Sequence, residues 1–481
     1  MFNLAQTITS LLLGLVAFVC YVLLRARSKF PKKAPSGSMG WPLVGETLAF
    51  LAPHDSTTVG SFIETRIGRY GKVFSSHLYG WPTIVSCDLE LNMFMLQNEG
   101  KLFTVNYPKA MHNILGRLSV LIVTGEMHRK LRSVVIGFSN YSKSSPDFFN
   151  YVERLSNEIL DKVGAIDHAK FFNEAKMFAF NVTAKTLLNL TPEQVASTRI
   201  PQDFLTFMEG FVSLPLSLPG TAHYSAVKAR ERLTIKMHKI IEERRRIHKG
   251  ANTDHKESDF LDIMISRVDL SDEERVSVAL DILLGGFETT ATLVSLALYF
   301  LANSPAALLE LRKEHQRIRR EKLEAGEKKN LSWEDYKKMD FTLKVVNESL
   351  RCGNIVKYLF KKSLQDIEFK GYFIPAGWQV LPIFTATHVD SAIHKNPFEF
   401  DPWRWTDHNV GKKVTPFGGG IRLCPGAALA QLETALFLHH LVLRFSWKVK
   451  GDDCPVAHPY VEFPKGLPLE FRPLNEMCHE N

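Results

Sequence analysis

The sequence is poor in cysteine: its 481 residues include six cysteines, far apart and with no CxxC pair among them. Structural zinc sites use closely spaced cysteines, and disulfide frameworks are typical of short, cysteine-rich chains, so the few scattered cysteines argue against both and favour a reducing compartment. A Pro/Gly/Ser-rich linker after residue 42 and an internal repeat are also lacking. We therefore expect one large body and not a string of small domains.

Charge is lacking at the start of the chain. Residues 1–24 carry no charged side chain, and residues 8–24 form a nearly unbroken apolar run of 17. At about 1.5 Å per residue such a helix is about 26 Å long, enough to cross a thin bilayer. A cleaved signal peptide is the alternative, but no basic segment precedes the run and no small-x-small site precedes Arg25. We predict a transmembrane anchor at residues 1–24.

A basic and proline-rich segment follows at residues 25–42, which we interpret as a hinge. Five Lys and Arg residues lie between Arg25 and Lys33, so the positive-inside rule places the rest of the chain in the cytosol. The proline and glycine residues that follow form a stiff connector to the domain at residues 43–481.

The overall charge is +8 and the pI is about 9.0, which suits an acidic protein partner or an anionic membrane surface. Nucleic acid is not expected as a partner, because the basic runs at residues 242–249 and 312–320 are mixed with acids and form no binding motif. These runs are typical of solvated helix faces.

Two segments have the pattern of strands. Residues 72–86 alternate around Tyr-Gly-Trp-Pro and predict a hairpin, and residues 367–381 predict a second β region with its turn at Pro375-Ala-Gly377. Most of the remainder is helical in pattern. The predicted fold class is mainly α with a smaller β region.

Residues 416–426 read PFGGGIRLCPG, a glycine-rich loop that leads to Cys424 and then to a predicted helix at residues 427–445. Pro425 suits the first helical position, and a helix N-terminus lowers the pKa of a thiol. A thiolate in such a loop could hold haem iron. A buried cysteine in a helix-capping loop is the plainer interpretation, but the full spacing Phe-x-x-Gly-x-Arg-x-Cys-x-Gly favours the ligand.

With Phe417, Gly420, Arg422, Cys424 and Gly426 in this spacing, the sequence resembles the cytochrome P-450 haem-thiolate monooxygenases. The resemblance implies the fold of that family and a haem b cofactor. It also implies that Cys424 is the axial iron ligand, that Phe417 packs beside the sulfur and that Arg422 reaches a haem propionate.

His128 and Arg132 lie at positions i and i+4 of a helix that begins near Gly125. Such a pair could clamp carboxylates, although two residues of this kind are more often on the surface. The resemblance implies that both contact the haem propionates.

A capping box at Ser271 and Glu274 predicts a helix of about thirty residues, closed by Pro305. The helix is apolar nearly all round, and its uncharged part is too short to span a membrane, so we expect it to be buried. Within it lies Gly-Gly-Phe-Glu288-Thr289. Helix packing alone could explain the glycines; the resemblance implies that Glu288 and Thr289 are catalytic and deliver protons for O–O cleavage.

Glu348 and Arg351 lie one helical turn apart, and Arg404 follows in a Phe-Asp-Pro-Trp-Arg-Trp segment. An acid and a base at this spacing predict nothing by themselves. The resemblance implies that the three residues form a buried structural triad.

The resemblance is strongest, in segments such as residues 347–356 and 377–384, to the plant steroid hydroxylases of the brassinosteroid pathway, above all the sterol C-22 hydroxylases. One departure is Phe360-Lys361-Lys362, where that group has His-Arg-Lys. Lys361 keeps the charge of the usual arginine but not its bidentate geometry. We expect altered haem contacts and altered specificity at this segment.

The sequence contains no flavin or nicotinamide fingerprint. The resemblance therefore implies electrons from NADPH through a separate NADPH-cytochrome P-450 reductase, a lipophilic substrate such as a sterol, and a single-pass location in the endoplasmic reticulum membrane with a cytosolic catalytic domain. The alternatives are hydroxylation of another terpenoid such as abscisic acid or a triterpenoid, a haem-thiolate isomerase or dehydratase, and a non-enzymatic haem sensor or carrier.

Overall fold

The computed structural model describes Gly14 and residues 33–41, 45–164, 169–213, 215–250, 259–326, 330–458 and 460–474. The predicted anchor at residues 1–24 lies outside these residues except for Gly14. The predicted hinge at residues 25–42 is described at residues 33–41. Both assignments, and the boundary of the domain at residue 43, remain predictions.

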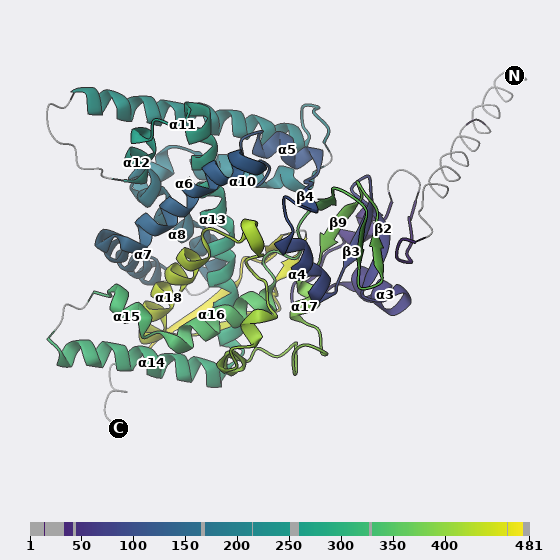
Figure 1. Ribbon diagram of the computed structural model, residues 1–481. Helices are drawn as coiled ribbons and strands as arrows, with labels where there is room; N and C mark the ends of the chain where they lie inside the picture. The colour runs from purple at the N-terminus through teal and green to yellow at the C-terminus, as the bar shows by residue number, and fades with distance from the viewer. Residues whose placement is uncertain are drawn as a thin grey trace, which may run out of the picture.

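Helices make up most of the body, and a strand-rich part lies at one end of it (Figure 1). The longer helices are α6 (Gly125–Ser144), α7 (Pro146–Gly164), α8 (Phe171–Leu188), α11 (Ala222–Gly250), α13 (Asp272–Ala302), α14 (Pro305–Glu324), α16 (Asp340–Gly353) and α18 (Ala427–Arg444). The shorter ones are α2 (Thr47–Phe50), α3 (Ser61–Tyr70), α4 (Leu89–Gln97), α5 (Lys109–Leu115), α9 (Pro192–Ser197), α10 (Ile200–Glu209), α12 (Phe260–Ser266), α15 (Trp333–Lys337) and α17 (Phe384–His388). The predicted fold class is confirmed.

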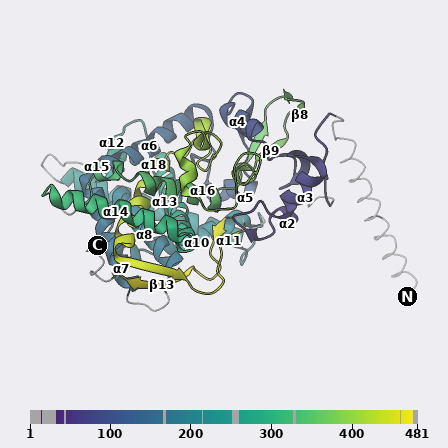
Figure 2. The ribbon, with the colours of Figure 1, turned by 90° about the horizontal axis from the view of Figure 1, so that it is seen from below.

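The strands form several small sheets. They are β1 (His54–Asp55), β2 (Val73–Leu78), β3 (Trp81–Ser86), β4 (Phe103–Val105), β5 (Ala169–Lys170), β6 (Lys361–Ser363), β7 (Ile367–Phe369), β8 (Tyr372–Ile374), β9 (Gln379–Pro382), β10 (Phe445–Val449), β11 (Val456–Ala457), β12 (Val461–Glu462) and β13 (Pro468–Pro473). The largest sheet has the order β2-β3-β9-β6-β4. Seen from below, β13 lies beside α7, far from the end of the body that carries α3 (Figure 2).

The predicted hairpin is β2 and β3, which pair in antiparallel fashion with Leu78 opposite Trp81. Its turn, at Tyr79 and Gly80, has positive φ at both residues, as a tight hairpin of this length requires. In the second β region the tight turn is at Lys370 and Gly371, between the paired strands β7 and β8. The predicted turn at residues 375–377 instead carries the chain from β8 to β9, which belongs to another sheet.

Helix α13 runs through the centre of the body (Figure 1). Its predicted capping box is present: the Ser271 side chain accepts from the Glu274 N–H, and the Glu274 carboxylate accepts from the Ser271 N–H. The helix ends at Ala302, and Pro305 begins α14. Among the described helices α13 is long and apolar enough to cross a membrane, but 72% of its apolar window is buried inside the protein. The prediction of a buried core helix is therefore confirmed.

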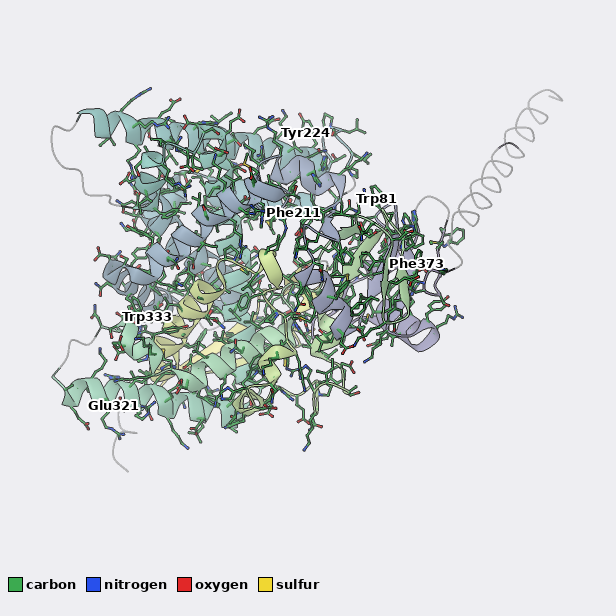
Figure 3. The ribbon with its side chains drawn as sticks, viewed as in Figure 1. Trp81, Phe211, Tyr224, Glu321, Trp333 and Phe373 are labelled. Carbon is green, nitrogen blue, oxygen red and sulfur yellow. The ribbon has the colours of Figure 1, made fainter. Side chains whose placement is uncertain are left out.

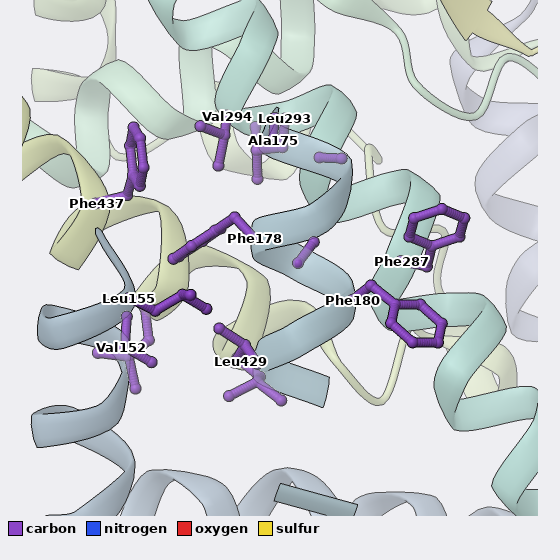
Figure 4. Close-up of a cluster of buried hydrophobic side chains, with 14 of the residues drawn as sticks. Val152, Leu155, Ala175, Phe178, Phe180, Phe287, Leu293, Val294, Leu429 and Phe437 are labelled. Carbon is purple, nitrogen blue, oxygen red and sulfur yellow. The ribbon is translucent and has the colours of Figure 1, made fainter. Parts of the chain in front are cut away.

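Aromatic rings join α13 to its neighbours. Phe180 of α8 faces Phe287 of α13, with ring centroids 5.3 Å apart, and Phe178 faces Phe437 of α18 at 5.0 Å (Figure 4). Alternate residues of α8 thus contact two different helices. Edge-on pairs of this kind stabilise a core beyond their buried area, and here they fix α8 against both α13 and α18.

Glu348 of α16 is a buried acid at the centre of a hydrogen-bond network, as predicted. Its carboxylate is fully buried and accepts from Arg351 (2.9 and 2.7 Å), from Arg404 Nε (3.1 Å) and from Trp405 Nε1 (2.8 Å). Burial alone would raise the pKa of Glu348, but the hydrogen bonds and charge of Arg351 lower it below its ordinary value. The network ties α16 to the segment that precedes the Cys424 loop.

Replacing the Glu348 carboxylate with an amide should destabilise the fold strongly. Glu348→Gln leaves two buried arginines without a charge partner, and breaking a buried pair costs about 3–5 kcal/mol. Thermal unfolding of the purified chain should show a large fall in Tm. The control is Glu321→Gln, on the outer face of α14 (Figure 3), whose Tm should stay unchanged within error. An equal Tm for both variants would contradict the role of Glu348.

Wild type should also lose stability in acid. Because the folded pKa of Glu348 lies below its ordinary 4.5, its contribution is complete above that pH and is lost as the pH falls through the folded pKa. Tm measured against pH should therefore fall more steeply below pH 4.5 for wild type than for Glu348→Gln.

Candidate functional site

The loop before α18 is closed by its own backbone. The Cys424 N–H donates to the Phe417 carbonyl at 2.9 Å. At Gly420, φ is +62° and an added Cβ would lie 2.0 Å from the Leu96 carbonyl oxygen, so the loop can press against α4 because this residue is glycine. Helix α18 begins at Ala427 with Gly426 as its N-cap. Pro425 therefore precedes the N-cap. The prediction that Pro425 occupies the first helical position is wrong.

Cys424 is an exposed free cysteine. Its thiol nonetheless lies deep enough that burial raises its pKa, while the N–H groups of Gly426 and Ala427 and the charge of Arg132 act in the opposite direction. The net pKa is raised. The prediction that the helix N-terminus lowers the pKa of Cys424 is therefore wrong for the free thiol, because the effect of desolvation outweighs the effect of the helix N-terminus.

Three of the predicted residues meet beside this loop. Arg132 Nη2 donates to the carbonyl of Leu423, next to Cys424. Arg422 Nη1 and Nη2 donate to the carbonyls of Val120 (3.0 Å) and Val123 (2.6 Å). His128 is buried, and burial followed by the charges of Arg422 and Arg132 lowers its pKa to about 4. The His128 ring is therefore neutral at pH 7.

A buried carboxylate that the sequence did not reveal connects this group. Glu99 accepts from Arg422 Nε at 2.9 Å and from Lys361 Nζ at 2.5 Å, and the side chains of Glu99 and Lys361 are 3% and 1% exposed. Burial lowers the pKa of Lys361, and Glu99 partly opposes this. Through Glu99, Lys361 thus lies beside Arg422, one of the residues predicted to contact a haem propionate. Glu99 had no sequence signal, because its role depends on a contact with a residue 323 positions away.

One face of α13 is open in the middle of an otherwise buried helix. Gly285 and Thr289 are exposed there, one turn apart, and an added Cβ at Gly285 would meet no atom within 4 Å. Thr289 Oγ1 donates to the Gly285 carbonyl at 2.6 Å. Gly286 has a different role, since its Cβ would lie 2.3 Å from Thr183 Oγ1 of α8. Close packing against α8 therefore explains Gly286, and the open face of α13 explains Gly285.

Glu288 is turned away from this open face toward α8. One carboxylate oxygen pairs with Lys176 Nζ at 2.8 Å, and the other is buried with no hydrogen-bond partner among the described residues. Among the residues that the structure describes, no hydrogen bond or ion pair joins Glu288 or Thr289 to the loop of Cys424. Lys176 is a second residue that the sequence did not reveal, because it lies on another helix.

The residues that meet at this site fit a haem. An accessible sulfur can ligate the iron, the cations at Arg132, Arg422 and Lys361 suit two propionates, and the uncovered face of α13 leaves room beside Gly285. No group of three or more His, Cys, Asp or Glu side chains able to hold a bare metal ion occurs among the described residues.

Comparisons with known proteins agree with this geometry. The cytochrome P-450 family model matches residues 35–465. Cytochrome P-450 724B1 of Oryza sativa subsp. japonica is 49% identical over 459 residues, which cover 93% of each chain. A cholesterol 22-monohydroxylase of Trigonella foenum-graecum is 40% identical and covers 97% of each chain. A steroid (22S)-hydroxylase of Brachypodium distachyon is 41% identical over 90% of this chain and 87% of its own.

The fold matches a solved structure as well. The retinoic acid bound cyanobacterial CYP120A1 superposes with a TM-score of 0.80 at 26% identity, over 92% of this chain and 99% of that one. The family predicted from the Cys424 loop is therefore confirmed, and so is the similarity to sterol C-22 hydroxylases. The chain belongs to the cytochrome P-450 family and is a monooxygenase with a haem-iron cofactor.

Proposed function

We propose that this chain hydroxylates the side chain of a plant sterol or steroid at C-22, as a step of brassinosteroid biosynthesis. The observation that carries the chemistry is the exposed Cys424 beside partly buried arginines and a buried lysine. The substrate is supported by relatives at 40–41% identity whose names specify 22-hydroxylation of cholesterol or steroids.

In this proposal the haem contacts divide between two kinds of side chain. Cys424 is the iron ligand, and Phe417, whose carbonyl accepts from Cys424, packs beside the sulfur. Arg422, Arg132 and neutral His128 hold the propionates. Lys361 joins them through Glu99, at the position where an arginine is usual in the resembled group. The bound haem iron supplies the activation of O₂.

Proton delivery is assigned to α13. Thr289 lies on the open face and can present its hydroxyl there once it releases the Gly285 carbonyl. Glu288 pairs with Lys176, and its second oxygen is unpartnered. A carboxylate held on one side and free on the other can accept a proton, and it could pass that proton to Thr289 once its side chain rotates away from Lys176 toward the open face.

The segment before Lys361 forms an aromatic cluster that suits a lipophilic substrate. Phe360 packs against Tyr79, Tyr107 and Tyr358 with ring centroids 5.0–5.6 Å apart. Tyr79 and Tyr358 share a hydrogen bond between their hydroxyls at 2.7 Å, so these two polar ends satisfy each other. With Phe360 in place of the usual histidine, the cluster next to the cations presents mainly hydrocarbon.

The partner and location follow the same proposal. NADPH supplies electrons through a separate reductase, which docks on the basic side near the Cys424 loop, where Arg129 and Lys412 are exposed. The apolar residues 8–24 anchor the chain in the endoplasmic reticulum membrane, and the domain lies in the cytosol. A membrane location brings the enzyme to substrates that partition into lipid.

The decisive test is turnover in microsomes that contain the full chain and a plant reductase. Campesterol-type sterols, cholesterol, abscisic acid and a triterpenoid are supplied separately, and products are identified by mass spectrometry. We expect a 22-hydroxysterol, formed with NADPH and absent with Cys424→Ala. Oxidation of another carbon or of a non-sterol would overturn the substrate, and turnover without NADPH would overturn the monooxygenase reaction.

Replacing Thr289 with alanine should uncouple NADPH use from product formation. Loss of a positioned proton donor lowers the rate of the productive step by about a hundredfold or more, while O₂ and NADPH are still consumed. The ratio of product to NADPH oxidised measures this directly. Thr292→Ala is the control, because Thr292 makes the same kind of bond, to the Glu288 carbonyl, from a buried position. If both variants are equally coupled, Thr289 does not deliver protons.

Replacing Lys361 with methionine should loosen the haem and the fold together. The change removes one charge from a buried pair, at a cost of about 3 kcal/mol, and leaves Glu99 to Arg422 alone. Haem transfer to apomyoglobin should be faster and Tm lower than in wild type. Lys362→Met is the matched control, since Lys362 is half-buried and lies over the Trp81 ring. Equal haem loss from the two variants would remove Lys361 from the haem-binding group.

A further inference from the structure

Two tyrosine hydroxyls beside the aromatic cluster of Phe360 have no partner. The hydroxyls of Tyr79 and Tyr358, which belong to that cluster, are bonded to each other. The hydroxyls of Tyr107, which also packs on Phe360, and of Tyr460 make no hydrogen bond with any residue that the structure describes. Burial raises the pKa of Tyr460, and Tyr358 and Tyr107 raise it further, so these phenols lie near one another.

Tyr460 is fixed in place without the use of its hydroxyl. It lies in the connection between β11 and β12, which pair in antiparallel fashion with Ala457 opposite Val461. The Tyr460 carbonyl accepts from the His458 N–H at 2.9 Å, which closes the turn. Its ring faces that of Phe211, just after α10, with centroids 6.2 Å apart; Phe211 is labelled in Figure 3. The backbone and the ring therefore hold Tyr460, and its hydroxyl is free for another task.

The Tyr460 hydroxyl is accessible although it lies deep in the protein. The residue is half-buried, and its hydroxyl oxygen retains accessible surface. A phenol on the outer surface would be solvated and would keep its ordinary pKa, whereas burial raises the pKa of Tyr460 far above that value. The accessible oxygen therefore faces space inside the protein. The phenol also stays protonated at neutral pH, so it can both donate and accept a hydrogen bond.

Tyr107, the other free phenol, lies among charged groups. It follows Val105 by two residues, and Val105 pairs with Lys361. Burial raises the pKa of Tyr107 to about 12, and the charges of Arg422 and Glu99 act on it in opposite directions. Tyr107 is thus close to the residues proposed to hold the haem propionates. Polar partners are at hand there, and its hydroxyl needs no oxygen from a substrate.

Tyr460 has no comparable partner nearby. The charged residue that acts on its pKa, after burial and the two phenols, is Glu288. Glu288 is held by Lys176 at 2.8 Å, and its second oxygen is enclosed by protein. The hydroxyl of Tyr358 is already bonded to Tyr79. The partner of the Tyr460 hydroxyl must therefore come from what occupies the interior space, which is water or a bound molecule.

We propose that Tyr460 determines substrate specificity by forming a hydrogen bond with the hydroxyl group of the sterol nucleus. This inference rests on the proposed function, in which the substrate is a sterol. A sterol of the cholesterol type carries a single oxygen, the 3-hydroxyl, at the opposite end of the molecule from its side chain. A hydroxyl both donates and accepts, and so does a phenol. The two groups therefore satisfy each other in a wall that otherwise presents mainly hydrocarbon.

Such a bond would also decide how far the sterol enters. Aromatic and aliphatic contacts hold a rigid steroid nucleus without fixing its position along its own length, because the hydrophobic effect has no direction. A single hydrogen bond at one end removes that freedom. Since the nucleus is rigid, fixing its hydroxyl at Tyr460 fixes where the side chain lies at the other end. Tyr460 would in this way influence which side-chain carbon is oxidised.

The test compares the binding of cholesterol with that of cholest-5-ene, which lacks the 3-hydroxyl, to the full-length, haem-loaded protein in nanodiscs. Kd is measured from the shift of the haem absorbance band during titration. Wild type should bind cholesterol at least about tenfold more tightly, because the analogue leaves the phenol of the site unpaired. In Tyr460→Phe the ratio of the two Kd values should fall close to one, through weaker binding of cholesterol alone.

The control is Tyr336→Phe, which removes the hydroxyl of a half-buried tyrosine on α15, far from α5 (Figure 1). Its Kd ratio should equal that of wild type. Tyr460→Phe keeps the ring that faces Phe211, so its Tm without sterol should also equal that of wild type. If Tyr460→Phe weakens the binding of both sterols equally, or of neither, Tyr460 only shapes the space and the proposal is overturned.

Wild type alone decides the proposal if Tyr460→Phe fails to fold. Epicholesterol, the 3α epimer, keeps the hydroxyl but directs it elsewhere, and it should bind as weakly as cholest-5-ene. Equal Kd values for the three sterols would show that the Tyr460 hydroxyl binds water only and would overturn the proposal.

Product analysis of the same preparations separates this inference from the two assignments beside it. Uncoupled NADPH use in Tyr460→Phe with an unchanged Kd ratio would place Tyr460 in proton transfer with Glu288 and overturn its role in sterol binding. Oxidation away from C-22 by wild type, with the expected Kd ratios, would overturn the proposed position of hydroxylation and support the role of Tyr460.

Discussion

The carboxylate of Glu348 is the interaction on which the rest of the body depends. It is fully buried and is shared between Arg351 of its own helix and Arg404 of a distant segment. Charges at this depth are tolerated because each is paired and hydrogen-bonded. Since the chain from Arg404 runs on directly into the loop of Cys424, the geometry of the candidate haem site depends on an acid that touches none of its residues.

Glu99 has a similar role beside the site itself. It holds Arg422, from the cysteine loop, and Lys361, from strand β6, on one buried carboxylate. Two cations could not lie so close in a dry interior without an anion between them. The positive charge of the two cations that we propose to bind propionates is therefore already partly neutralised within the protein. This pairing lets a lysine occupy a position where the resembled group has an arginine.

Much of this could be predicted from the sequence where the signal is local. The capping box of α13, its burial and the β2–β3 hairpin follow from residues within one or two turns of each other. Glu99 and Lys176 could not be found in this way, because each acquires its role from a partner on another element. The pKa of Cys424 was mispredicted for a related reason: the helix terminus is local, but burial is a property of the whole fold.

Two acids in the middle of α13, Asp281 and Glu288, show how this helix carries polar groups through an apolar core. Asp281 is bound by Ser119 and Val120 and so fixes the loop beside the haem site, whereas Glu288 is bound by Lys176 and so fixes α8. Both acids stabilise neighbours, but they differ in one respect. Asp281 has an acceptor bond at each oxygen, whereas Glu288 keeps one buried oxygen unpaired. An unpaired carboxylate oxygen is costly to maintain, which supports the proposal that Glu288, rather than Asp281, passes a proton.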